Sequence, residues 1–173
     1  MTSRSRLALA TLALSIIPAL ASAQSPLADA LREHSKTMGK NLVAGAETMP
    51  ADKYSYKPTP AQMSFGDIVK HLAGGNDLLC GAIGGMKAPA RAKLDPAADK
   101  ATLVARLKES FAFCDQAFAK LDDSKLSEQF KLFGETFSRA AAEMEAVGDW
   151  SDHYSQMANY LRLNGHLPPT AKK

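Results

Sequence analysis

Two histidines and one aspartate are spaced so that a pair of helices could hold a metal ion. Asp149 and His153 are four residues apart, which places both side chains on one face of a helix. A carboxylate oxygen and an imidazole nitrogen on one face can bind the same divalent metal. A third ligand from a facing helix would complete a site with a position left open for water. His71 lies in another amphipathic segment and is our candidate for this third ligand.

Polar residues near these three could support them from a second layer. Asp67 lies four residues before His71, and Gln156 lies three residues after His153, where its amide could orient an imidazole. Asp152 is an alternative carboxylate, although it is adjacent to His153 and therefore off its face. The four-residue spacing is also common in ordinary pairs on a helix surface, so the spacing alone leaves both interpretations open.

Four amphipathic segments are predicted to position these side chains. Apolar residues recur every three or four positions, which predicts helices over residues 27–49, 64–80, 99–121 and 138–163. Ser64 and Asp67 have the spacing of a capping box, which marks the start of the second helix. The glycines after residue 80 are expected to end it. The inward side of the last helix is predicted to consist of Ala140, Met144, Val147, Ser151, Tyr154, Met157, Ala158 and Leu161.

These segments predict an all-α four-helix bundle, because no segment reads convincingly as a strand. Residues 130–137 are expected to form an extended turn into the last helix. The connection between the second and third helices is long enough to run the length of the bundle, so these two helices would lie parallel. Cys80 and Cys114 would then lie at the same end, and both a disulfide and two buried free thiols stay open.

The first 23 residues have the layout of a secretory signal peptide. Arg4 and Arg6 precede an apolar run over residues 7–20, and the small residues Ala21 and Ala23 lie directly before an expected cleavage site at Gln24. The apolar run is shorter than the roughly 20 residues that span a bilayer. We therefore predict a signal peptide over residues 1–23, a helical domain over 24–173, and a periplasmic or secreted protein.

Charge and composition limit the classes of partner that the chain is expected to bind. The chain of 173 residues suits a single domain, and its formal charge of +3 falls by two when Arg4 and Arg6 are removed. A nearly neutral protein has no electrostatic case for binding nucleic acid. No second apolar stretch is long enough to span a membrane, so no membrane association is expected after the signal is removed. An apolar helix face left uncovered would favour a homodimer.

Two motifs make the chain similar to the DinB family. Residues 152–165 read DHYSQMANYLRLNG and resemble the family's last helix, with its closing glycine. Residues 49–60 (MPADKYSYKPTP) and 64–72 (SFGDIVKHL) resemble the passage from its first helix to its second. The resemblance covers nearly all of the chain after residue 23. It implies a four-helix bundle with an up-down-down-up course, in agreement with the long second connection.

The resemblance also implies a divalent metal, often zinc or nickel, held by three histidines. His71 matches the histidine of the second helix, and His153 matches the second histidine of the pair on the last helix. The remaining histidine position falls on Asp149. A set of two imidazoles and one carboxylate is chemically ordinary and harder than three imidazoles, so it could shift the preference towards iron or manganese. The same replacement would also fit a site that has degenerated.

Two functions follow from these expectations. The first is a metal-dependent hydrolase or transferase acting on an unknown small molecule, and hydrolysis suits an exported protein better than thiol transfer. The alternative is a non-catalytic, stress-related binding or structural bundle with a degenerate metal site. The sequence contains neither a serine-nucleophile motif nor a glycine-rich phosphate loop, so catalytic residues other than the metal ligands stay unassigned.

Overall fold

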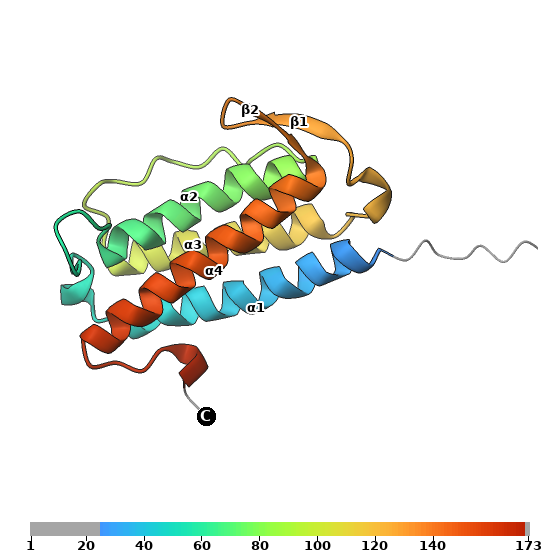
Figure 1. Cartoon of the computed structure of the whole chain (residues 1–173). Coiled ribbons are helices and arrows are strands. Elements are labelled where there is room, and N and C mark those ends of the chain that lie inside the picture. The colour runs from blue at the N-terminus through green and yellow to red at the C-terminus, as the bar shows by residue number, and fades with distance from the viewer. Residues whose placement is uncertain (1–24, 172–173) are drawn as a thin grey trace, which may run out of the picture.

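The computed structural model describes residues 25–171, which form a bundle of four long helices with one short hairpin (Figure 1). The predicted all-α four-helix bundle is thereby confirmed. The predicted signal peptide, residues 1–23, lies outside the described residues. None of the described helices is long and apolar enough to cross a membrane. The helices are α1 (Pro26–Thr48), α2 (Phe65–Gly84), α3 (Lys100–Phe118) and α4 (Arg139–Leu163), and the strands are β1 (Gln129–Leu132) and β2 (Glu135–Ser138).

The helices follow an up-down-down-up course. In Figure 1, α2 and α3 run in the same direction, while α1 and α4 run in the opposite one. The connection over residues 85–99 returns along α2 from one end of the bundle to the other, as its length predicts. Each of α2 and α1 packs against both α3 and α4. The outer surface of α2 therefore has two neighbours. Helix α4 lies along one edge of this surface, and the connection over residues 85–99 lies along the other.

Helix α2 begins at Phe65 because Ser64 and Asp67 form the predicted capping box. Ser64 Oγ accepts a hydrogen bond from the Asp67 amide at 3.1 Å, and the Asp67 carboxylate accepts one from the Ser64 amide at 3.4 Å. The helix continues four residues beyond its predicted end at residue 80. Gly84 is still helical, and its role is close packing against α3. A Cβ at Gly84 would lie 2.4 Å from the Ala117 carbonyl oxygen. The helix ends at Gly85, whose φ is +65°.

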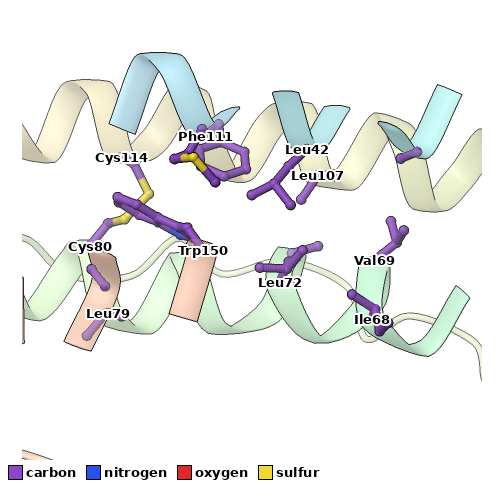
Figure 2. Close-up of a cluster of buried hydrophobic side chains, with 14 of the residues drawn as sticks. Leu42, Ile68, Val69, Leu72, Leu79, Cys80, Leu107, Phe111, Cys114 and Trp150 are labelled. Atoms are coloured by element: carbon purple, nitrogen blue, oxygen red, sulfur yellow. A yellow bond between two sulfur atoms is a disulfide. The ribbon is translucent and has the colours of Figure 1, made fainter. Parts of the chain in front are cut away.

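The core is one cluster of buried apolar side chains, most of them from the four helices, and Figure 2 shows part of it. Trp150 of α4 is fully buried, and its ring centroid lies 5.7 Å from that of Phe111 on α3. The predicted inward side of α4 is wrong in its first half, because Met144 is 65% exposed and Ser151 is also exposed. The core-facing positions in that half are Arg139, Ala142, Glu143, Ala146 and Trp150. The buried tryptophan therefore sets the rotation of α4.

A β-hairpin stands where an extended turn was expected. Strands β1 and β2 pair antiparallel, with Gln129 opposite Ser138 and Leu132 opposite Glu135. The two turn residues, Phe133 and Gly134, have φ values of +53° and +85°. Asn-Gly or Asp-Gly is the common sequence for such a turn, whereas a bulky aromatic residue at positive φ is unfavourable. The usual sequence signal for a hairpin is therefore missing here.

Candidate metal centre

The three candidate ligands come together between α2 and α4. His71 projects from α2, and Asp149 and His153 project from consecutive turns of α4. Asp149 Oδ1 lies 3.4 Å from His71 Nε2 and 3.3 Å from His153 Nε2. One ligand atom from each residue lies within 4.8 Å of the other two. The carboxylate thus stands between two imidazoles contributed by different helices.

The centre is open on one side and anchored on the other. The side chain of His71 is 47% exposed and that of Asp149 is 32% exposed, whereas that of His153 is only 10% exposed. Solvent therefore reaches the centre from the side of His71. His153 is held among core residues, and its position is consequently the most constrained of the three.

Contacts within the cluster raise the pKa of His153 and lower the pKa of Asp149. The hydrogen bond with Asp149 raises the pKa of His153 above its ordinary value, although burial of the imidazole acts in the opposite direction. Burial is the largest single influence on Asp149 and acts to raise its pKa, but the hydrogen bonds and charges of His153 and His71 together lower it. Asp149 is therefore ionised at neutral pH, and it offers a negatively charged oxygen to a cation.

The chain matches a known family over most of the described bundle. The model of the DinB superfamily matches residues 36–157, a span that contains all three candidate ligands. The chain belongs to the DinB superfamily. No curated protein matches it at a significant level.

Solved structures share the DinB fold at low sequence identity. A DinB-like protein from Bacillus subtilis has a TM-score of 0.64 at 21% identity, with 79% of this chain and 92% of that chain covered. A DinB-like protein from Bacillus cereus has a TM-score of 0.69 at 15% identity, covering 82% and 95%. A conserved protein from Enterococcus faecalis has a TM-score of 0.64 at 16% identity, covering 82% and 98%. These likenesses establish the bundle architecture.

Asp67 and Gln156 were expected to support the metal ligands of this DinB site, but both form hydrogen bonds with other residues. Asp67 is engaged at the start of α2, where its carboxylate accepts hydrogen bonds from Ser64, and within residues 25–171 Asp67 forms no hydrogen bond with His71. Gln156 Nε2 donates to Asp152 Oδ2 at 2.7 Å, although Gln156 also contributes to the raised pKa of His153. Asp152 is exposed and lies outside the cluster.

His153 Nδ1 is buried and has no hydrogen-bond partner within the described part of the chain. Its other ring nitrogen, Nε2, is the one that faces Asp149. Since Nδ1 is enclosed and Nε2 faces the carboxylate, Nε2 is the ring nitrogen that is available to the centre. The geometry therefore assigns Nε2 of His153 to the centre.

Asn76 is a supporting residue that the sequence reasoning missed. Trp150 Nε1 donates to Asn76 Oδ1 at 2.7 Å, and Asn76 Nδ2 donates to Ser110 Oγ at 3.0 Å. Ser110 in turn donates to the Leu107 carbonyl at 2.8 Å, so the buried chain crosses from α4 through α2 to α3. The sequence signal for this role is the position of Asn76, a polar residue on the apolar face of the second predicted helix.

The two cysteines of this DinB chain are joined. Cys80 and Cys114 form a disulfide with their Cα atoms 5.1 Å apart, and both residues are fully buried. They lie near the C-terminal ends of α2 and α3, which the parallel course brings together (Figure 2). The bond therefore ties α2 to α3 nine residues after His71.

Proposed function

We propose that this DinB protein holds one divalent metal ion through Nε2 of His71, Nε2 of His153 and a carboxylate oxygen of Asp149. The observation that carries the proposal is the mutual approach of these atoms within 4.8 Å. Metal–ligand distances of about 2.0–2.2 Å place neighbouring ligands about 3.4 Å apart in a tetrahedral site. The separations of 3.3 and 3.4 Å around Asp149 fit that requirement, and the two imidazole nitrogens, which lie within 4.8 Å of each other, would draw together around a bound ion.

The donor set suits several metals and leaves room for a reactant. Two imidazoles and one carboxylate are compatible with zinc, nickel, iron and manganese. A bound divalent ion would supply an activated water at neutral pH or polarise a carbonyl or phosphoryl oxygen. The chain's own contribution is to fix His153 in the core, to keep Asp149 ionised and to leave His71 exposed. We therefore propose a metal-dependent hydrolase or transferase that acts on a small molecule.

We further propose that residues 1–23 are removed as a signal peptide and that the DinB domain works in the periplasm or outside the cell. The support is the order of a basic start, an apolar run and small residues before Gln24. The disulfide agrees with this proposal, because such bonds persist mainly in oxidising compartments. The homodimer expected from the sequence stays a prediction.

Elemental analysis of the purified protein, without a histidine tag, tests the metal centre. We expect about one divalent metal per chain and its loss in His71→Ala, Asp149→Ala and His153→Ala. His166→Ala is the matched control, because this histidine lies past the end of α4 and should leave the metal content unchanged. The proposal is rejected if the wild-type protein stays metal-free after incubation with zinc, nickel, iron(II) and manganese(II) salts.

Turnover separates the two functions once metal binding is established. The loaded protein would be screened against ester, amide and phosphate substrates, with His71→Ala as the control for background hydrolysis. Metal-dependent turnover supports the enzyme. Stoichiometric metal without turnover across these classes and across group-transfer assays would favour the non-catalytic binding bundle.

A further inference from the structure

A pocket of about 370 Å³ lies on the outer side of α2, against the connection between α2 and α3. Its lining includes four basic side chains, and we call it the basic pocket. The basic residues are Lys70 of α2, Arg91 and Lys93 of the connection, and Arg106 of α3. Gly74 of α2 also lines it. Cations from three segments that are distant in sequence therefore surround one cavity.

The positive charge of the basic pocket is only partly neutralised. Arg91 is held by Asp77 at 2.6 Å and by Glu109 at 2.7 Å, and Glu109 also lies 3.5 Å from Arg106. Within residues 25–171, neither Lys70 nor Lys93 forms a salt bridge. The two carboxylates therefore offset two of the four cations. An anion entering the pocket would meet two ammonium groups that are free to bind it.

The basic pocket and the metal centre share α2 but no residue, because the pocket lies towards the connection and the centre lies towards α4. Lys70 directly precedes His71, and Gly74 lies three residues after it, about 5–6 Å away on a helix surface. The helix surface there carries no side chain at Gly74 or at its neighbour Gly75. A Cβ added at either glycine would meet nothing within 4 Å.

Packing within the described chain therefore does not explain these two glycines, although glycine is unfavourable inside a helix compared with alanine. Their effect is a bare strip of helix that leaves space between the exposed imidazole and the pocket. A single small molecule could lie over this strip with one end at His71 and the other end in the pocket.

We propose that the substrate of this metal centre is a small anionic molecule, whose carboxylate or phosphate group binds Lys70 and Lys93 in the basic pocket while its reacting group lies beside His71, Asp149 and His153. This inference rests on the proposed function, because it names the substrate class of the same centre. Arg91 and Arg106 form part of the wall of the pocket, since their carboxylate partners hold them in place. Lys70 and Lys93 are the specificity residues, and Gly74 provides the clearance.

Matched hydroxamates test the proposal, because a hydroxamate binds a protein-held metal whatever the enzyme's reaction. The three probes are propionohydroxamate, which has no charged tail, succinic acid monohydroxamate, which has a carboxylate tail, and β-alanine hydroxamate, which has an ammonium tail. Calorimetric titration of the metal-loaded protein should give about tenfold tighter binding for the carboxylate probe than for the uncharged one. The ammonium probe should bind more weakly than both. Added salt should reduce the preference.

Variants assign the preference to the pocket. Lys70→Gln with Lys93→Gln should abolish the advantage of the carboxylate probe and leave binding of propionohydroxamate and of the metal unchanged. Lys36→Gln with Lys120→Gln is the matched control, because these lysines are exposed on α1 and after α3. Gly74→Ala should raise the Tm and yet weaken the carboxylate probe. A phosphonate-tailed probe then shows whether phosphate or carboxylate is preferred.

The outcomes separate this inference from the metal proposal. Equal affinity for all three probes on a metal-loaded protein, or an advantage that survives the double lysine variant, would overturn the basic pocket and leave the metal centre intact. Failure of the protein to bind any metal would overturn both.

Discussion

Trp150 Nε1 donates a hydrogen bond to Asn76 Oδ1 over 2.7 Å, and this buried contact joins α4 to α2 beside the candidate metal centre. Trp150 directly follows Asp149, and Asn76 lies five residues after His71. Since one ligand of the centre comes from α2 and two come from α4, any slip between these helices separates the ligands. The Trp150–Asn76 hydrogen bond therefore sets the geometry of the centre without belonging to it.

Asn76→Ala should lower the free energy of unfolding by about 2–3 kcal/mol, because it leaves the buried indole N–H without an acceptor and removes the hydrogen bond that Asn76 donates to Ser110 Oγ. It should also weaken metal binding, although Asn76 is not a ligand. Urea unfolding and metal titration measure the two effects. Asn159→Ala on the exposed side of α4 is the control and should change stability by less than about 0.5 kcal/mol. Wild-type metal affinity in Asn76→Ala would contradict the positioning role.

Asp149→His places a third imidazole where the resemblance to the family expects one. The variant should still bind a metal, and its preference should move from manganese and iron towards zinc and nickel, because imidazole is a softer donor than carboxylate. Competition titrations with pairs of metals measure the change in relative affinity. Asp149→Asn, which removes the charge with little change of shape, should weaken all four metals. An unchanged order of affinities in Asp149→His would show that residue 149 does not bind the metal.

Replacing Cys80 and Cys114 with alanine should lower the free energy of unfolding by about 4 kcal/mol, the loop-closure value for a sequence separation of 34 residues. A reductant should lower the Tm of the wild-type protein and leave the Tm of the double variant unchanged. Thermal melts with and without dithiothreitol measure both. An equal effect of the reductant on the two proteins would mean that the bond is not present in the isolated chain.

Glu143 should make stability depend on pH in a direction opposite to that of most carboxylates. Its pKa is raised, mainly by burial and then by the charge of Asp123, and Arg139 opposes the shift only partly. A carboxyl whose pKa is higher in the folded state stabilises the fold below its unfolded pKa, and this contribution is lost as the pH rises through the folded pKa.

Glu143→Gln should therefore raise the Tm at pH 7.5, and the gain should vanish well below the ordinary glutamate pKa of about 4.3, where the wild-type carboxyl is protonated in both states. Glu145→Gln, at an exposed position on α4, is the matched control and should show no such dependence. Melts of all three proteins across this pH range measure the difference. A gain that is constant with pH would mean that burial of the charge is not its cause.

Much of the fold was predictable because the relevant signals are local. Apolar residues at helical spacing predicted all four helices to within four residues of their ends, and the Ser64–Asp67 cap fixed the start of α2. The pairing of Asp149 with His153 is also local, since residues four apart share a helix face. The long connection predicted the parallel course of α2 and α3 because a short loop cannot join parallel helices.

The remaining features depend on contacts between distant segments. Hydrophobicity placed Met144 inside, but the packing of Trp150 on Asn76 rotates α4 so that Glu143 is buried in its place. The hairpin was not predicted from the sequence, because its turn places Phe133, and not asparagine or aspartate, at positive φ. The role of Asn76 is visible only when its partners on α3 and α4 are known. No local pattern in the sequence contains such information.

The disulfide also decides how the chain responds to proteolysis. Cys80 and Cys114 bracket the connection over residues 85–99, which contains Arg91 and Lys93 as trypsin sites. A cut after either residue opens the backbone but leaves both fragments linked through sulfur. The nicked protein would therefore migrate as one band on a nonreducing gel and as two after reduction. A protease could thus open one wall of the basic pocket and leave the four helices covalently connected.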